Sequence, residues 1–365
     1  MQAAAPPTRS PWLFGRNLDL LAFVGPVVVA IAFVLIGRAV GLRSTPPWAF
    51  LTCVIVVDVA HVHGTLYRVY LDPAEVKRRK LLYLGTPLLA YAVGVALHLS
   101  GGALRFWRVL DYFAVWHFVR QQIGWVALYR VRAGELADPS RRVDRYLDPA
   151  VTYAATLYPL VYWHATLPKR FSWFMRGDFF VVSQRVGQAL LPFAHAVWAA
   201  LLLGFALRQV QLFATGRTVN VGKVLVVSGT ALLWWLGIVH WNDDYSFTVT
   251  NVLPHGIPYF VLVLLYARRR FTDPDAAPAR LGQRLFAGGV ALAFLALVLL
   301  AFFEEWAWDL YVWHDHEPIF GEGRVLSPTV LAFLVPILAL PQAVHYVTDG
   351  YVWRGQENPD LRKYL

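Results

Sequence analysis

Long apolar stretches separated by short polar segments recur along the whole chain. A helix needs about twenty apolar residues to cross a bilayer, and windows of that length predict about ten transmembrane helices. The predicted spans are 18–37, 48–68, 81–100, 107–130, 149–167, 188–206, 222–241, 250–268, 284–304 and 328–350. The pattern therefore predicts an all-α, polytopic helical membrane protein.

Basic residues mark alternate loops between these spans. The second, fourth, sixth and eighth spans are followed by "EVKRRK" (75–80), "YRVRAGELADPSRRVDR" (129–145), "RQVQLFATGR" (208–217) and "ARRRF" (267–271). Cytoplasmic loops of membrane proteins carry an excess of arginine and lysine. We therefore expect these loops, and both termini, on the cytoplasmic side.

Composition agrees with a membrane protein, since 58% of the 365 residues are hydrophobic and only 15% are charged. The formal charge of +10 lies in short clusters between apolar runs, as membrane topology requires, so we expect no nucleic-acid partner. The single cysteine, Cys53, lies inside an apolar run, which excludes disulfides, iron–sulfur clusters and covalently attached c-type haem.

No long linker or internal repeat divides the sequence, so we expect residues 1–365 to form a single integral-membrane domain. The first residues lack the basic, apolar and small-residue order of a signal peptide, so we expect the first span to be retained.

Some predicted spans contain ionisable or amide side chains, which are costly in hydrocarbon and normally face a bundle interior with a function there. The candidates for a function are Asp58, His61 and His63 in the second span, His117, Arg120 and Gln121 in the fourth, His255 in the eighth, and His345 and Asp349 in the tenth.

Helical spacing places several of these side chains in pairs. Residues three or four apart share a helix face, which pairs Asp58 with His61, His117 with Gln121, and His345 with Asp349. His63 points away from His61, so the two share a ligand only if Gly64 loosens the backbone. Two prolines flank His255 in "LPHGIPY" and predict a kinked or broken helix there.

At a rise of about 1.5 Å per residue, these groups form one column from mid-membrane to the cytoplasmic side. Imidazoles and carboxylates from several helices are the usual metal ligands of helical bundles. The predicted ligands are His61, His63, His117, His255, His345 and Asp349. We expect Asp58 and Gln121 to orient or add to them, and Arg120 to pair with a charge or anchor a substrate headgroup. The column could form one site or two.

Nitrogen and oxygen ligands without thiolate suit iron, zinc or manganese. We expect iron, because the reaction most often needed on an apolar substrate in a membrane is activation of oxygen at a C–H or C=C bond.

The motifs "HVHG", "WHFVRQQ", "LPHGIPY" and "HYVTDGYVW" resemble, in their scattered membrane histidines, the histidine-rich integral-membrane metallo-oxygenases. That group includes fatty-acid desaturases and hydroxylases and the bacterial carotene dioxygenases. The HxxxH and HxxHH boxes of desaturases are missing from this sequence, so no functional residue is carried over. The resemblance implies an apolar, lipid-like substrate and, for some reactions, an electron-donor protein.

The leading hypothesis is a membrane metalloenzyme that oxidises or cleaves an apolar lipid-like substrate entering from the bilayer. Two alternatives remain open: a transporter that uses the polar column as a proton or ion path, and a metal-free lipid transferase with a His/Asp general base. The preference for arginine over lysine is compatible with a bacterium of GC-rich genome, and hence with a bacterial plasma-membrane location.

Overall fold

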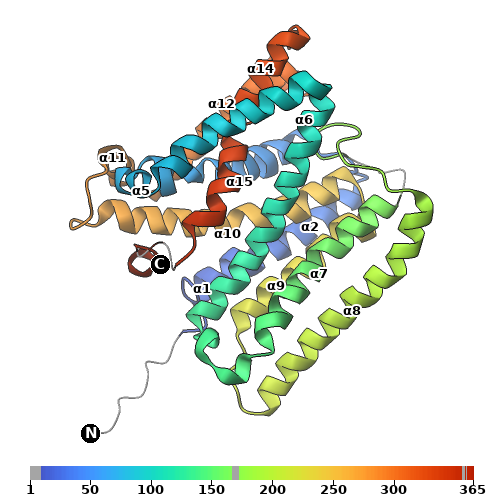
Figure 1. Ribbon diagram of the computed structural model, residues 1–365, viewed down its shortest axis with the longest axis vertical. Helices are drawn as coiled ribbons and strands as arrows, with labels where there is room; N and C mark the ends of the chain where they lie inside the picture. The colour runs from blue at the N-terminus through green and yellow to red at the C-terminus, as the bar shows by residue number, and fades with distance from the viewer. Residues whose placement is uncertain (1–9, 167–171, 356–357, 359) are drawn as a thin grey trace. The chain divides into compact units, whose positions relative to one another are not determined.

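The computed structural model describes residues 10–166, 172–355, 358 and 360–365. Within these residues the chain is all-helical and contains no β-strand (Figure 1). Residue 167, the last of the predicted span 149–167, lies outside the described residues. The all-α prediction is confirmed.

By length and composition, eight helical stretches of the described chain can cross a membrane. They are Arg16–Ala39, Pro47–Tyr70, Lys80–Arg132, Gln184–Ala214, Val221–Trp241, Asp244–Thr272, Val290–Trp313 and Pro328–Val352. Several long apolar helices of this kind indicate an integral membrane protein.

The count differs from ten for two reasons. Helix α6 (Lys80–Arg132) contains both predicted spans 81–100 and 107–130, with a break in helical geometry at Gly102, where φ is 70°. Helix α7 (Asp144–Ala165) covers most of the span predicted at 149–167 but is not among the candidate spans. Besides Asp144 and Asp148 it contains several tyrosine, threonine and proline residues, which lower its mean hydropathy. The positions of the termini stay a prediction.

The contacts between Cα atoms group the described residues into two compact units. The first comprises the described parts of Met1–Ala39, Phe118–Arg170 and Val181–Pro254, and the second those of Val40–His117, Phe171–Phe180 and His255–Leu365. Helices α6 and α10 (Asp244–Thr272) contribute to both units, so the division does not follow linkers in the sequence. The prediction of a single domain therefore stays a prediction.

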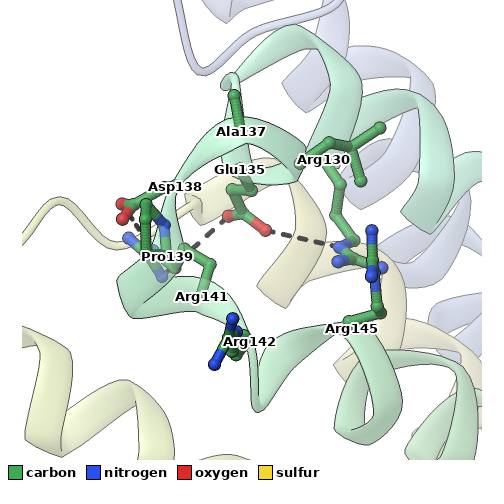
Figure 2. Close-up of a pocket in the computed structure, with 9 residues that line it drawn as sticks. Arg130, Glu135, Ala137, Asp138, Pro139, Arg141, Arg142 and Arg145 are labelled. Atoms are coloured by element: carbon green, nitrogen blue, oxygen red, sulfur yellow. Dashed lines mark ion pairs between the residues drawn. The ribbon is translucent and has the colours of Figure 1, made fainter.

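The first unit is a helical bundle in which α7 packs along α8 and α9 (Figure 1). Its elements, apart from its parts of α6 and α10, are α1 (Arg16–Asp19), η1 (Leu20–Val24), α2 (Gly25–Ala39), η4 (Glu135–Ala137), η5 (Pro139–Arg141), α7, α8 (Gln184–Ala214), α9 (Val221–Trp234) and η6 (Trp235–Trp241). The turns between α6 and α7 enclose a small pocket rich in arginine (Figure 2). The side chains of α8 are largely exposed, as expected for a helix that faces lipid.

The second unit is built around α12 and the helix that carries His61. Its elements, apart from its parts of α6 and α10, are α3 (Pro47–Ala49), η2 (Phe50–Val59), α4 (Ala60–Val62), η3 (Leu66–Tyr70), α5 (Pro73–Arg78), α11 (Arg280–Ala287), α12 (Val290–Trp308), η7 (Asp309–Trp313), α13 (Glu317–Phe320), α14 (Pro328–Leu338), α15 (Leu340–Val352) and α16 (Asp360–Tyr364).

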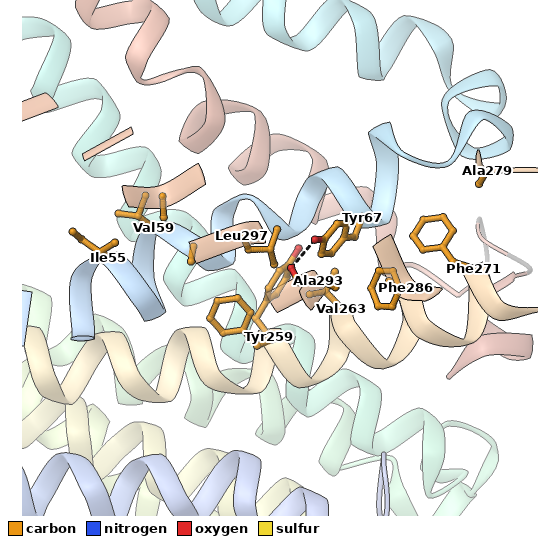
Figure 3. Close-up of a cluster of buried hydrophobic side chains, with 14 of the residues drawn as sticks. Ile55, Val59, Tyr67, Tyr259, Val263, Phe271, Ala279, Phe286, Ala293 and Leu297 are labelled. Carbon is orange, nitrogen blue, oxygen red and sulfur yellow. Dashed lines mark hydrogen bonds between the residues drawn. The ribbon is translucent and has the colours of Figure 1, made fainter. Parts of the chain in front are cut away.

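A buried apolar cluster holds η2, α10 and α12 of this unit together (Figure 3). Val59 of η2 and Tyr259 and Val263 of α10 are buried here with Leu297 of α12. Burial of such side chains contributes about 25 cal/mol per Å² of apolar surface. The cluster fixes the two helices that carry His61 and His255, so apolar packing determines where these imidazoles lie.

Candidate metal centre

Four imidazoles converge inside the second unit. His61 comes from α4, His117 from α6, His255 from α10 and His345 from α15, and none of the four residues is more than 3% exposed. The Nε2 atoms of His61 and His255 lie 3.1 Å apart, and those of His117 and His345 lie 3.2 Å apart. Four helices distant in sequence thus present the same type of nitrogen to one another.

The ring spacings show that the two pairs form one group. Ring centroids lie 4.6 Å apart for His117 and His345, 5.0 Å for His61 and His345, and 5.2 Å for His117 and His255. A zinc ion holds imidazole nitrogens at about 2.0–2.1 Å, which places two such nitrogens roughly 3.3 Å apart in tetrahedral geometry. The separations of the Nε2 atoms are of that size.

Two sets of three potential ligand atoms lie within 4.8 Å of one another. One consists of His61, His117 and His255, and the other of His117, His345 and Asp349. His117 belongs to both sets, so the described residues place five of the six predicted metal ligands in one continuous group. Nitrogen and carboxylate oxygen donors without thiolate suit iron, zinc and manganese.

Close helix packing brings His61 and His255 together. A Cβ atom built on Gly256 would lie 2.6 Å from a methyl carbon of Val57 and 2.8 Å from the Val57 carbonyl oxygen. Only glycine therefore allows α10 to approach η2 this closely. Helix α10 runs without interruption through Pro254 and Pro258, so of the kinked or broken helix predicted beside His255 the break is absent. Gly256 at this point permits the close crossing of the two helices.

The helix before His61 is wound unusually. Residues 50–59 and 66–70 form π-helical segments on either side of α4, and π-helical turns are frequent at functional sites. Helix α4 ends at Val62, His63 is a turn residue, and the helical winding resumes at Gly64. The two imidazoles have different partners, since Nε2 of His61 lies 3.1 Å from Nε2 of His255 and Nε2 of His63 lies 2.9 Å from Glu304.

Neighbouring polar groups orient some of the candidate ligands. The Thr65 hydroxyl lies 2.9 Å from Nδ1 of His345, which leaves Nε2 of that ring facing His117. The Trp353 indole N–H donates to the Asp349 carboxylate at 2.6 Å. Hydrogen-bonded partners such as Thr65 fix the ring orientation and tautomer of metal ligands. Asp58 lies 3.8 Å from Nδ1 of His61, beyond hydrogen-bond distance, so the orienting role predicted for it stays a prediction.

His63 is the one predicted ligand that belongs to neither set. It follows His61 by two residues, a rotation of about 200° on a helix, and its Nε2 lies 2.9 Å from the Glu304 carboxylate. Glu304 also accepts from the indole N–H of Trp308 at 3.3 Å and from the amide of Gln342. His63 therefore joins a separate histidine and carboxylate pair.

Arg120 and Gln121 belong to the first unit, whereas the histidines belong to the second. Arg120 is exposed and donates to the Tyr153 hydroxyl at 2.8 Å, and Gln121 is buried. The sequence predicts that Asp58 and Gln121 contribute to catalysis by orienting or adding to the ligands, and that Arg120 pairs with a charge or anchors a substrate headgroup. These roles stay predictions.

The sequence reading missed several residues around the histidines. Thr65 and Glu304 contact them directly, and the rings of Tyr259 and Tyr346 lie against them. Glu304 and Glu305 stand together at the end of an apolar run, a signal that could have marked Glu304. Threonine and tyrosine at these positions resemble ordinary helix residues, so only the fold reveals them.

The first unit also buries a charged network that the sequence did not suggest. The Lys223 ammonium lies 3.0 Å from Glu135 and 2.9 Å from Asp148. Nε of Arg130 lies 3.2 Å from Asp148. The Asp144 carboxylate accepts from Arg141 at 3.2 Å and from Arg208 at 2.7 Å.

Comparison with protein-family models, with curated proteins and with solved structures found no significant match.

Proposed function

We propose that this chain is a membrane-embedded, metal-dependent enzyme that oxidises or cleaves an apolar, lipid-like substrate. The observation that carries the proposal is the convergence of the Nε2 atoms of His61, His117, His255 and His345 from four helices. Iron is the first candidate metal, with zinc and manganese as the others.

A hydrogen-bonded packing cluster explains this arrangement less well than a bound cation. A neutral imidazole offers one donor and one acceptor, so two facing Nε2 atoms can make at most a single hydrogen bond. Four mutually facing rings bring together groups of the same kind in an apolar interior, where poorly satisfied polar atoms are costly. A divalent cation would engage all four nitrogens at once, and Asp349 would offset part of its charge.

The residues would have distinct tasks at such a centre. The four histidines and Asp349 would hold the metal, and Thr65 would keep Nε2 of His345 available as a ligand. Asp58 would orient His61. Iron bound by nitrogen and oxygen ligands supplies oxygen activation at C–H or C=C bonds.

The membrane setting supports an apolar substrate. The histidines lie within helices that are long and apolar enough to cross a bilayer, so a lipid-like molecule could approach laterally. A hydroxylation or desaturation that reduces dioxygen to water takes two electrons from a donor, and an electron-donor protein is the proposed source for those reactions, whereas cleavage by dioxygen needs none. A bacterial plasma membrane is the proposed location, with which the preference for arginine over lysine is compatible.

Metal content tests the proposal directly. Detergent-purified protein, expressed with iron, zinc and manganese supplied, is analysed by inductively coupled plasma mass spectrometry beside His117→Ala and His345→Ala. His195→Ala is the matched control, because His195 lies in the first unit and contacts the Tyr158 hydroxyl at 3.0 Å. We expect about one metal ion per chain in the wild type and the control, and loss in both other variants. Folded wild-type protein without metal would refute the metal centre.

Ion-coupled transport is the second candidate, because the spans also contain the His63 and Glu304 pair and the nearby Asp58. Proton or ion flux in proteoliposomes separates the two functions. A flux abolished by His63→Gln but independent of bound metal would favour transport over the enzyme.

A further inference from the structure

A pocket of about 200 Å³ opens between the end of α6 and the start of α7 (Figure 2). Its charged lining consists of Arg130, Glu135, Asp138, Arg141, Arg142 and Arg145. The segment is one of the basic loops predicted on the cytoplasmic side. The pocket lies entirely within the first unit and is independent of the histidine group.

The buried cations at this pocket already have carboxylate partners. Arg130 contacts Asp148 at 3.2 Å and Glu135 at 3.6 Å, and Arg141 contacts Asp144 at 3.2 Å. Their charges are thus largely offset within the protein, so these two side chains line the pocket without an unpaired charge to offer a ligand.

Asp138 is the only exposed carboxylate in the charged lining. Hydrogen bonds from Ser140, whose backbone N–H donates at 2.9 Å, together with the charge of Arg141 hold its pKa below the usual value. Asp138 is therefore ionised at neutral pH and faces Arg141 at 3.9 Å.

Arg142 and Arg145 differ from the buried arginines. Both are exposed, and they stand three residues apart, a spacing that places them on one face of a helical turn. Neither guanidinium forms an ion pair with a carboxylate among the described residues. Figure 2 accordingly shows ion pairs at Arg130 and Arg141 and none at Arg142 or Arg145. The pocket thus carries two uncompensated positive charges.

Exposed apolar side chains occur in the same segment: Leu136 lines the pocket, and Val143 and Tyr146 follow Arg142 and Arg145 in the sequence. Leu136 is 54% exposed, Val143 57% and Tyr146 75%. Arginine beside exposed aliphatic and aromatic side chains at the end of a membrane helix is the composition expected where a protein meets lipid headgroups.

We propose that this pocket binds the phosphate group of an anionic ligand, with Arg142 and Arg145 as its cationic contacts. Guanidinium groups donate bidentate, charge-assisted hydrogen bonds to phosphate oxygens, and two unpaired arginines complement a phosphate dianion. The ligand is either an anionic phospholipid headgroup or a soluble phosphate ester, since both present the same phosphate chemistry.

Binding of defined probes to the full-length, detergent-purified protein tests the proposal. Dioctanoyl phosphatidic acid, dioctanoyl phosphatidylcholine, glycerol 3-phosphate and inorganic phosphate are titrated separately and followed by native mass spectrometry at fixed ionic strength. The variant is R142Q/R145Q. The control is R268Q/R280Q, which removes two exposed arginines from outside the pocket with the same change of charge.

We expect saturable binding of phosphatidic acid that is weakened roughly thirtyfold in R142Q/R145Q and unchanged in the control, since each basic residue contributes on the order of 1 kcal/mol near anionic headgroups. Binding of phosphatidic acid alone identifies a lipid headgroup, whereas equally tight glycerol 3-phosphate identifies a soluble ester. The proposal is overturned if R142Q/R145Q and R268Q/R280Q bind phosphatidic acid with equal affinity. It is also overturned if the wild-type protein binds none of phosphatidic acid, glycerol 3-phosphate and inorganic phosphate.

Discussion

In the first unit the buried Lys223 ammonium lies between the carboxylates of Glu135 and Asp148, whereas in the second unit four buried imidazoles face one another. Both clusters place polar groups inside helices that are otherwise apolar. In the first, each charge meets an opposite charge supplied by the chain itself. In the second, groups of the same kind meet, and the histidines outnumber the neighbouring carboxylates. The charges of the first cluster are paired within the chain and need no ligand. The facing imidazole nitrogens of the second cluster would be stabilised by a bound cation.

Loss of a single side chain should therefore affect a different property in each cluster. Removal of one member of a closed ion network leaves a buried charge without compensation, so the cost falls on folding. Removal of one of several like ligands relieves crowding among similar groups, so the cost falls on metal affinity. The following variants separate these outcomes.

Replacement of Lys223 by methionine should have the largest effect. The change leaves Glu135 and Asp148 buried without their ammonium partner, and breaking a buried pair typically costs about 3–5 kcal/mol. We expect a large fall in thermal stability and in the yield of monodisperse protein, measured by fluorescence-detected size exclusion during a thermal ramp. Lys80→Met removes an exposed lysine and should behave as the wild type. Equal stability of the two variants would contradict the closed-network interpretation.

Replacement of Thr65 by alanine should have an intermediate effect that is confined to the second unit. The variant loses the hydroxyl that contacts Nδ1 of His345. Loss of such an orienting partner lowers metal affinity by about 10–100-fold. Competition with a chelator of known affinity measures this change, and Thr65→Ser, which keeps the hydroxyl, should restore most of the affinity. An alanine variant that binds metal as tightly as the wild type would argue against an orienting role.

Replacement of His63 by glutamine should have the smallest effect on metal content. His63 pairs with Glu304 and lies outside both sets of converging ligands. We therefore expect His63→Gln to retain the metal stoichiometry of the wild type, whereas the same substitution at His61 should lower it. Elemental analysis of both variants in parallel decides the point. If His63→Gln also loses metal, His63 and Glu304 belong to the metal centre.

The membrane character and the helical class of this protein follow from its sequence alone. Apolar runs long enough to cross a bilayer determine both, because a backbone in hydrocarbon must satisfy its hydrogen bonds within a helix. The same reasoning singled out the buried histidines, since ionisable groups in such runs are costly and rare. These conclusions need only local patterns of about twenty residues.

Which of these residues meet depends on how the helices pack. Periodicity places His63 and Asp58 near His61 along the helix, but it cannot assign His63 to Glu304 or bring His345 to His117, because those contacts depend on packing between distant helices. The close approach at Gly256 and the buried network of Lys223 likewise arise from side chains far apart in sequence. Local sequence thus determined what each helix carries, and the packing of the helices determined which groups can act together.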